Sequence, residues 1–547
     1  MGHRYFVNST DSFLSDALRG FVAANPGIVW HRDPGFLARE TPTRSGRVAL
    51  VSGGGSGHEP MHAGLIGEGL LDAVCPGLIF TSPNALQIAA ATRHVDSGAG
   101  VLHIVKNYTG DVMNFRIARD MAQDEGVETD FVVVADDVAT ESDDDAPGRR
   151  GTGATIVVEK ICGAAAAEGT ALGDVAALGR RVADNARSMS VALTACTVPG
   201  SDEPSFDLGD DEMELGVGIH GEAGADRTAW RPAHEIVQTL LERIDASLQL
   251  PDDDDVIVVV NGLGGSHPLE LHLLFGHVLE ELDRRGVRVA RSLVGTMVTA
   301  LDMRGASVTV VRVDDEMVRL WDAPTDAPAW PRLVAAPPSA LADTTFASPH
   351  DDAESGPECA WVSAFVDRVR DAVDDLTALD RQAGDGDFGT NMSAALQHFS
   401  SPLRGSDADV LDAVSQSFFV RSGGTSGAVF GTLFRELSKA FADEDDFTGA
   451  LSAGTQAALD AIVELGGAQV GDNTVVDALH PANEALQRGD SLQQVAAAAV
   501  EGAESTKDRV ARKGRASYVG EAGRDVVDPG ALVVSWLFEA AAEASAG

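Results

Sequence analysis

Short runs of apolar residues predict four buried strands in the first half of the chain. They lie at 47–51, 101–105, 131–134 and 256–260, with segments of helical character between them. Continuous rather than alternating apolar runs are typical of strands that are covered on both faces. The pattern therefore predicts an α/β fold with a parallel sheet, whose chemistry gathers at the carboxyl ends of the strands.

The second half of the chain carries helical periodicity instead. Apolar residues recur at three- and four-residue steps from Val362 to Leu379, which predicts one helix that delivers Asp380 at its C-terminal end. Alanine-rich segments at 449–465 and 493–504 continue the helical pattern. A stretch rich in Pro, Ser and Asp between the two halves is typical of a linker, so we expect a compact all-α domain after it.

Composition narrows the class of protein. The 547 residues are 44% hydrophobic, and no apolar run is long enough to cross a bilayer. The N-terminus lacks the apolar core of a signal peptide, so we expect a cytoplasmic protein. Four widely spaced cysteines lack metal-ligand spacing and are expected to be reduced and structural.

A formal net charge of −43 argues against nucleic acid and anionic membranes as partners. The basic residues are nearly all arginines, and the lysines are confined to five positions: Lys106, Lys160, Lys439, Lys507 and Lys513. This pattern indicates a halophilic protein, because a short Debye length at high salt suppresses repulsion between carboxylates. An ordinary acidic cytosolic protein is the alternative.

An acidic glycine loop at 379–391 predicts a divalent-metal site. Three carboxylates fall within eight residues there: Asp380, Asp385 and Asp387. Clustered carboxylates are hard oxygen ligands suited to Mg²⁺. An EF-hand is excluded because Thr390 stands where that loop needs glycine. The Asp387-Phe388-Gly389 triplet is not a protein-kinase motif, because no matching catalytic loop exists. The alternative is a solvated acidic turn that binds no metal.

Two glycine-rich stretches in the first half present histidines. His58 lies in the loop 52–60 after the first predicted strand, which is neither a Walker A motif nor a dinucleotide fingerprint. Lys106 and Asp111 follow the second predicted strand, so they lie beside that loop if the two strands are neighbours. His220 has glycines around it, and Glu222 could orient its ring. Each histidine alone could equally be structural.

Polar loops recur in the second half. The stretch 422–427 offers hydroxyls and bare backbone to a phosphate group, and 471–477 is a capping or supporting element. Two more such loops lie at 514–518 and 528–531. Each alone is typical of a cap or a turn.

Taken together, these motifs resemble the dihydroxyacetone kinase family over nearly the whole chain. The first half is similar to the ketose-binding K domain through GGGSGHEPMHAG, FTSP, VKNYTGDVMNF, GRRG and MELGVGIHGE. The second half is similar to the nucleotide-binding L domain through LTALDRQAGDGDFGTNM, GGTSGAVFG, GDNTVVDAL, GRASYVGE and DPGA. The resemblance implies an α/β K domain at 1–335 with two α/β subdomains, about 1–185 and 186–335. A linker at 336–357 and an all-α helical-barrel L domain at 358–547 would follow.

The resemblance also implies roles for single residues. His220 would hold the substrate carbonyl as a covalent hemiaminal, and His58 and Asp111 would be the acid/base pair. The implied substrate-binding positions are Gly55, Ser56, Gly57, His58, Lys106 and Asp111. The implied Mg²⁺ ligands are Asp380, Asp385 and Asp387. The implied nucleotide-binding positions are Phe388, Gly389, Thr390, Asn391, Thr425, Ser426, Gly466, Val475, Arg515, Asp528 and Gly530.

The reaction implied is phosphorylation of the terminal hydroxyl of dihydroxyacetone by ATP and Mg²⁺, in a homodimer. Phe388 stands where the family commonly has histidine, and residues 151–155 depart from the glycine-rich motif that is usual in the family. These departures leave erythrulose or glyceraldehyde open as the substrate. Cyclising FAD lyase activity and a non-catalytic ligand sensor are the competing classes.

Overall fold

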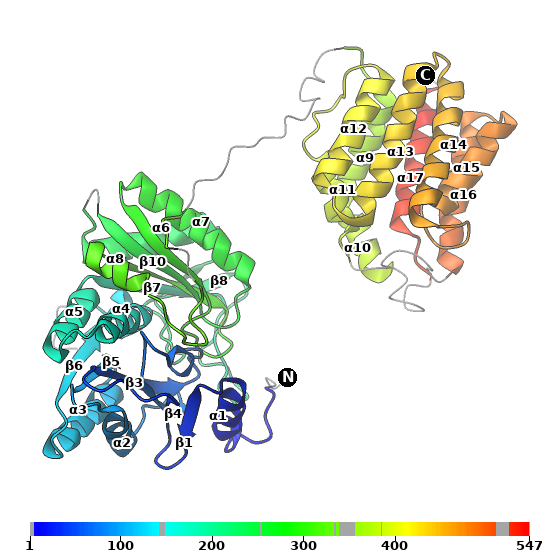
Figure 1. The fold of residues 1–547 in the computed structure, drawn as a ribbon. Helices are drawn as coiled ribbons and strands as arrows, with labels where there is room; N and C mark the ends of the chain where they lie inside the picture. Colours follow the sequence, from blue (N-terminus) through cyan, green and yellow to red (C-terminus); the bar gives the residue numbers. More distant parts are fainter. Residues whose placement is uncertain are drawn as a thin grey trace. The chain divides into compact units, whose positions relative to one another are not determined.

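The structure of the chain is a computed structural model, and two compact units, Met1–Leu341 and Ala342–Gly547, make it up (Figure 1). It describes residues 5–141, 148–251, 254–332, 335–338, 356–383, 386–509 and 525–545. The first unit is an α/β fold with two sheets and the second is helical, which confirms the predicted fold class. The four cysteines are free and buried, as predicted. Among the described helices, none combines the length and the apolar character that a bilayer span requires.

The first sheet has the strand order β1-β2-β4-β3-β5-β6. Its strands are β1 (Ile28–His31), β2 (Phe36–Arg39), β3 (Ala49–Ser56), β4 (Ala73–Ile79), β5 (Val101–Lys106) and β6 (Thr129–Val134). The last four strands in this order are parallel, and β1 and β2 form an antiparallel edge. Helices cover both faces, as the continuous apolar runs predict: α1 (Phe13–Ala24), α2 (Ala85–Val95), α3 (Thr109–Asp124), α4 (Ala154–Glu168) and α5 (Leu172–Asp184).

The glycines after the first predicted strand continue that strand instead of leaving it. β3 extends through Ser56, because its glycines let the backbone of neighbouring segments approach closely. A Cβ atom on Gly53 would lie 2.5 Å from the carbonyl oxygen of Cys75. The prediction that the strand stops at Val51 and gives way to a loop was therefore wrong, and the loop begins at Gly57.

The second sheet has the order β11-β10-β12-β7-β8-β9. Its strands are β7 (Ala186–Ala192), β8 (Glu212–Leu215), β9 (Asp226–Ala229), β10 (Asp255–Gly262), β11 (Arg288–Gly295) and β12 (Gly305–Arg312). Only β10 and β11 pair in parallel among these strands. The expectation of a single parallel sheet that includes 256–260 was wrong, because β10 belongs to this separate, mainly antiparallel sheet.

Helix α4 lies between the two sheets of this unit. It contacts β3, β5 and β6 of the first sheet and β7 and β12 of the second. Every residue from Ala154 to Ala166 is buried, as expected for a helix that is enclosed on all sides. On the far face of the second sheet lie α6 (Ala233–Leu248) and α7 (Pro268–Arg284), and α8 (Asp315–Trp321) packs against α4. Two short 3₁₀ turns complete the unit: η1 (Ala63–Leu65) and η2 (Val138–Thr140).

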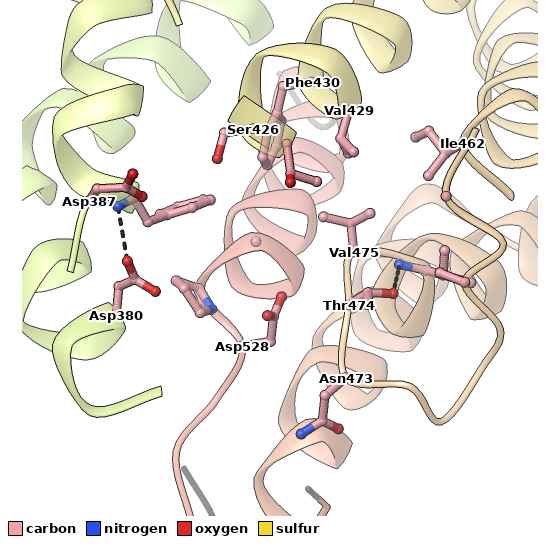
Figure 2. A pocket seen from close by; sticks show the side chains of 17 residues that line it. Asp380, Asp387, Ser426, Val429, Phe430, Ile462, Asn473, Thr474, Val475 and Asp528 are labelled. Atoms are coloured by element: carbon pink, nitrogen blue, oxygen red, sulfur yellow. Dashed lines mark hydrogen bonds between the residues drawn. The ribbon is translucent and has the colours of Figure 1, made fainter. Parts of the chain in front are cut away.

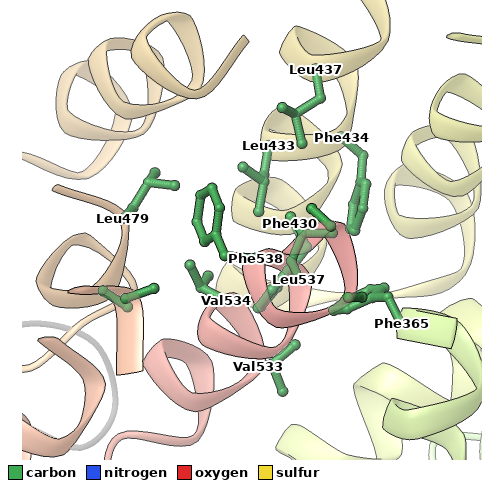
Figure 3. Close-up of a cluster of buried hydrophobic side chains, with 14 of the residues drawn as sticks. Phe365, Phe430, Leu433, Phe434, Leu437, Leu479, Val533, Val534, Leu537 and Phe538 are labelled. Carbon is green, nitrogen blue, oxygen red and sulfur yellow. The ribbon is translucent and has the colours of Figure 1, made fainter. Parts of the chain in front are cut away.

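The second unit is all-helical where it is described. Its helices are α9 (Ala360–Asp371), α10 (Val373–Ala383), α11 (Phe388–Leu396), α12 (Asp407–Arg421), α13 (Gly424–Asp443), α14 (Phe447–Gly466), α15 (Val476–Arg488), α16 (Leu492–Glu504), the 3₁₀ turn η3 (Ser505–Asp508) and α17 (Pro529–Ala544). Helices that follow each other in sequence pack side by side, and α17 packs against α9, α15 and α16. Phe365, Phe430, Phe434 and Phe538 meet in its core (Figure 3).

The predicted helix from Val362 to Leu379 is two helices. α9 ends at Asp371, and α10 begins at Val373. Val369 and Leu376 pack into the same core from either side of the break, so the apolar spacing continues although the helix does not. Asp380 therefore lies inside α10, before its last residue.

Candidate active site

Two histidines that lie 162 positions apart in sequence meet in the first unit. The ring centroids of His58 and His220 are 4.8 Å apart. His58 follows β3 of the first sheet, and His220 follows β8 of the second. Tyr108 and Phe80 stand edge-on to the His220 ring at 4.4 and 5.6 Å. The predicted residues of both sheets therefore converge on one place.

His58 is fully buried, and its surroundings determine which ring nitrogen carries hydrogen. Its Nδ1 lies 2.8 Å from the carbonyl oxygen of Thr299, which can only accept, so Nδ1–H is the donor. Nε2 then carries the lone pair, and it has no hydrogen-bond partner among the described residues. Burial and the nearby charges of His220 and Lys106 lower the pKa of His58 well below its usual value. The ring is neutral near pH 7 and can accept a proton at Nε2.

Glu222 orients His220, as the spacing predicted. The backbone N–H of His220 donates to one carboxylate oxygen of Glu222 at 2.9 Å, and Nδ1 lies 3.4 Å from the other. Burial would raise the pKa of Glu222, but the hydrogen bond and charge of His220 lower it to about 2, with help from Arg150. A Cβ atom on Gly218 would lie 2.0 Å from a carboxylate oxygen of Glu222, so a side chain there would displace the Glu222 carboxylate. Glu222 is therefore ionised at neutral pH and can accept a hydrogen bond from Nδ1–H of His220, which leaves Nε2 with the lone pair.

Lys106 and Asp111 lie beside the glycine strand because β3 and β5 are neighbours. The Lys106 ammonium is fully buried and lies 3.1 Å from the carbonyl oxygen of Gly53 and 3.7 Å from Asp111. A Cβ atom on Gly54 would lie 2.0 Å from the ammonium nitrogen, so this glycine makes room for it. One carboxylate oxygen of Asp111 is buried with no hydrogen-bond partner in the described part of the chain.

The remaining predicted substrate positions shape the wall of the site. Gly55 and Gly57 both pack on Phe80, where a Cβ atom would come within 2.7 and 2.8 Å. Gly57 has a φ of +105°, which favours glycine. The Ser56 hydroxyl donates to the carbonyl oxygen of Gly77 at 2.7 Å. These residues fix the course of the chain into His58.

The second unit contains a cavity of about 290 Å³. Figure 2 shows Asp380 and Asp387 on one side of this pocket and Ile462 and Val475 on the other, with Asp528 between them. The pocket is lined by Asp380, Asp387, Phe388, Thr425, Ser426, Val429, Phe430, Ile462, Gly466, Ala468, Asn473, Thr474, Val475, Val476, Asp528, Pro529 and Gly530. One end is acidic and the other is apolar, which suits a ligand with a cation-bound phosphate chain and a ring.

The acidic end of the pocket fits a divalent cation. Burial raises the pKa of Asp528 to about 7, and the negative charges of Asp477 and Asp380 add to this shift. Carboxylates that repel each other in this way are stabilised by a bound cation. Asp380 accepts the backbone N–H of Phe388 at 3.0 Å, which ties α10 to the start of α11. The third predicted ligand, Asp385, lies outside the described residues, and the described residues alone hold no cluster of three metal-ligating side chains.

The N-terminus of α13 faces the same pocket. Thr425 and Ser426 lie in its first turn and line the cavity, as predicted for a phosphate-binding loop. Unpaired backbone N–H groups and the helix dipole favour an anion at such a position. Asp477 shapes the opposite loop by accepting the N–H groups of Gly471 and Thr474 at 2.5 and 3.0 Å.

Some predicted nucleotide positions do not line the pocket. Gly389 packs α11 against α10, where a Cβ atom would lie 2.0 Å from the Thr377 hydroxyl, and Thr390 and Asn391 are not among the lining residues. Arg515 lies outside the described residues. Asn473 and Thr474 also line the pocket, although their stretch was interpreted only as a capping or supporting element. The other lining residues that were not predicted are Val429, Phe430, Ile462, Ala468, Val476 and Pro529. They are apolar, so nothing in the sequence separates them from core residues.

Comparison with known proteins gives matches to both units. Residues 19–329 match the Dak1 domain and residues 382–543 match the DAK2 domain. The chain is 39% identical over 578 residues to the triokinase/FMN cyclase of Rattus norvegicus, covering 99% of each chain. It is 37% identical over 575 residues to the L-erythrulose 1-kinase of Mycolicibacterium smegmatis, covering 98% of this chain and 99% of the relative.

A solved structure matches over nearly the whole chain as well. The crystal structure of the dihydroxyacetone kinase from C. freundii in complex with AMP-PNP and Mg²⁺ is 30% identical, with a TM-score of 0.64. The match covers 99% of each chain. The similarity therefore extends over both units and not over one domain alone.

Proposed function

Because the chain belongs to the single-chain dihydroxyacetone kinase family, we propose that it transfers a phosphoryl group from ATP, with Mg²⁺, to the terminal hydroxyl of a short-chain ketose. Its relatives support a triose or tetrose as substrate, and dihydroxyacetone is our first candidate. The observation that carries the proposal is the 4.8 Å approach of His58 and His220, which come from different sheets.

His220 is the group that captures the substrate. Its Nε2 forms a bond to the carbonyl carbon as the π pair of the C=O bond moves onto oxygen, and this oxygen takes up one proton from solvent. Nδ1 gives up one proton to solvent past Glu222, which lies 3.4 Å away and stays ionised. The product is a neutral hemiaminal, so charge and atoms balance. Glycerol has no carbonyl and cannot form this bond, which gives the site its selectivity for ketones and aldehydes.

His58 and Asp111 activate the terminal hydroxyl of the captured ketose. Both present a buried atom without a hydrogen-bond partner among the described residues, Nε2 of His58 and one oxygen of Asp111. A buried acceptor without a partner is costly, and a substrate hydroxyl would satisfy it. The proton of that hydroxyl passes to this pair as its oxygen attacks the γ-phosphorus of ATP.

The helical unit binds the nucleotide. Asp380, Asp387 and the undescribed Asp385 are the residues that would hold Mg²⁺, which neutralises charge on the triphosphate when it is bound. Thr425 and Ser426 at the start of α13 bind phosphate oxygens through hydroxyl and backbone N–H groups. The apolar end of the pocket, with Val429 and Ile462, accommodates the adenine ring.

A substrate panel tests the proposal. ADP release is measured with ATP and Mg²⁺ for dihydroxyacetone, D- and L-erythrulose, glyceraldehyde and glycerol. We expect turnover with at least one of the four carbonyl compounds and none with glycerol. If no carbonyl compound is phosphorylated while intact-mass spectrometry still detects a ketone adduct, the chain is a sensor and not a kinase.

A second candidate activity is cyclisation of FAD. It is favoured by the relative from Rattus norvegicus, which is named a triokinase/FMN cyclase and matches 99% of this chain. The same nucleotide pocket would hold the adenosine half of FAD. We test it by replacing ATP and ketose with FAD and a divalent cation, and by looking for riboflavin cyclic phosphate. Its absence would confine the chain to sugar phosphorylation.

A further inference from the structure

A buried line of polar side chains runs behind the ketose site. Glu159 on the enclosed helix α4 is fully buried, and one of its carboxylate oxygens lies 2.6 Å from Nδ1 of His62. Nε2 of the same ring lies 2.9 Å from the ammonium of Lys106. Lys106 in turn lies 3.7 Å from Asp111. Burying a carboxylate on a helix that is enclosed on all sides is costly, so a function for it is expected.

The hydrogens along this line can be assigned. The Ser52 hydroxyl donates to the carbonyl oxygen of Ile104 at 2.8 Å, so its oxygen is an acceptor for Nδ1 of His62 at 3.2 Å. The Glu159 carboxylate is also an acceptor, so Nδ1 of His62 carries the hydrogen. Nε2 of His62 therefore has its lone pair directed at Lys106, and the ammonium donates to it.

We propose that Glu159 and His62 are positioning residues for phosphoryl transfer, which hold the Lys106 ammonium in place and, through it, Asp111 at the ketose site. The ammonium nitrogen of Lys106 is fully buried and lies within hydrogen-bond distance of Gly53 and His62 and 3.7 Å from Asp111, so Lys106 is a structural support and not a group that a ligand could reach. Glu159 supplies negative charge that, together with Asp111, favours the ammonium form of Lys106.

The charge balance gives this line a pH dependence. The groups that face Lys106 are His62, Asp111, Glu159 and His58. Burial lowers the pKa of Lys106, whereas Asp111 and Glu159 raise it. Removing the charge of Glu159 lowers that pKa further, so the ammonium form is lost at a lower pH. If activity needs the ammonium, kcat/KM then decreases at a lower pH in such a variant than in the wild type, on the basic side of the pH profile.

The test compares Glu159→Gln, His62→Gln and the double variant with the full-length enzyme, and it rests on the proposed kinase activity. In Glu159→Gln we expect the basic limb of kcat/KM for the ketose to move down by about one pH unit. The KM for ATP stays unchanged, because the nucleotide pocket lies in the other unit. The double variant shifts no further than the larger single shift, because both residues act through one line.

Asp72→Asn is the matched control. Asp72 is a buried carboxylate just before β4 that accepts the N–H of Leu50 and pairs with Arg39, without contact to Lys106. We expect it to lower the melting temperature and leave the basic limb in place. The proposal is overturned if the basic limb of kcat/KM does not move in Glu159→Gln, or if it moves by the same amount in Asp72→Asn.

A second measurement does not depend on turnover. Lysine labelled with ¹³C at Cε gives signals from only five lysines, and Lys106 is assigned by the signal lost in Lys106→Met. We expect the Lys106 signal to titrate at the pH of the basic limb in the wild type, and at a lower pH in Glu159→Gln. If Glu159→Gln does not fold, the wild type alone still gives a test. A Lys106 signal that titrates at a pH different from that of the basic limb of kcat/KM overturns the proposal. If the wild type phosphorylates nothing, the proposed function fails, while the NMR titration of the variants still decides whether Glu159 controls Lys106.

Discussion

Each of the two central histidines has one ring nitrogen engaged by an acceptor. The carbonyl oxygen of Thr299 accepts a hydrogen bond from Nδ1–H of His58, and the Glu222 carboxylate faces Nδ1 of His220. In both rings this leaves Nε2 with its lone pair, as a proton acceptor requires in one case and a nucleophile in the other. The two roles are separated by environment, because His58 is fully buried whereas 17% of the His220 side chain is exposed and can be reached by a substrate.

Replacing His220 tests the nucleophile. In His220→Ala we expect loss of the ketone adduct and a fall in kcat/KM for the ketose of about 10²-fold or more, because the substrate is no longer held in position. Adduct formation is followed by intact-mass spectrometry after reduction, and turnover by ADP release. The control is His234→Ala, since His234 is an exposed residue of α6. Native turnover in His220→Ala would remove His220 from the mechanism.

Replacing Asp380 tests the acidic end of the nucleotide pocket. In Asp380→Asn we expect Mg·ATP binding to weaken strongly, because one of the proposed ligands loses its charge. Capture of ketone by His220 should remain, because His220 lies in the other unit. Binding is measured by calorimetry with a non-hydrolysable ATP analogue. Asp374→Asn is the matched control, as Asp374 is an exposed residue of the same helix, and equal affinity in both variants would contradict the metal site.

Residues with unusual chemistry could be predicted from the sequence, and residues with ordinary chemistry could not. His58 and His220 stand in glycine-rich stretches, and Lys106 and Asp111 follow a predicted strand. The structure places His58 beside His220 and Lys106 beside Asp111. Glu159 was not predicted, because its partner His62 lies 97 positions away in sequence and only the fold brings the two together. Apolar pocket residues such as Val429 left no signal at all.

The first turn of α13 depends on a glycine that contacts the preceding loop. A Cβ atom on Gly427 would lie 2.0 Å from the carbonyl oxygen of Ser422, whereas one on Gly423 would meet nothing within 4 Å. Gly423 also has an ordinary φ of −89°. Two glycines at the start of α13 therefore differ in the substitutions that they tolerate.

We expect Gly427→Ala to displace this turn and to raise the KM for ATP, with a loss of about 1–3 kcal/mol in the free energy of unfolding. Gly423→Ala should leave both quantities nearly unchanged. Steady-state kinetics in ATP and urea unfolding measure the two effects. If both variants behave alike, the close packing of Gly427 does not shape the nucleotide site.

The type of each element, helix or strand, could be predicted from the sequence, but the residues at which it ends could not. The apolar spacing from Val362 to Leu379 is continuous because α9 and α10 face one core, so the break after Asp371 could not be seen in it. Likewise, continuous apolar runs identify buried strands but not the sheet to which each belongs. β10 has the same pattern as β5 and lies in the other sheet, because strand pairing is a long-range property.

At the scale of the whole molecule, the change from strand to helix periodicity predicted two domains of different class, and the structure has an α/β unit and a helical unit. The predicted linker lies largely outside the described residues. The homodimer and the cytoplasmic location stay predictions, and light scattering would measure the first. Long motifs in a fixed order carried the family assignment, because no single loop among them was specific.

The excess of acidic residues leads to a prediction about salt. The chain has 84 Asp and Glu residues against 41 Lys and Arg residues, so the folded state carries strong self-repulsion at low ionic strength. Screening shortens the Debye length from about 10 Å at 0.1 M to about 3 Å at 1 M salt. Exposed ion pairs such as Arg243–Asp226 weaken over the same range, but each contributes little. We therefore expect the melting temperature to rise from dilute buffer to multimolar KCl.

Circular dichroism measures this shift, and ADP release should rise over the same range. Tetramethylammonium chloride at equal ionic strength separates screening from specific binding of K⁺, since it screens charge without fitting small-cation sites. Equal stabilisation by both salts identifies screening of the carboxylates as the cause, and stabilisation by KCl alone identifies bound K⁺. A protein that is fully folded and active in dilute buffer and declines as KCl is added would contradict the halophilic interpretation, because its net charge would then be carried without a need for screening.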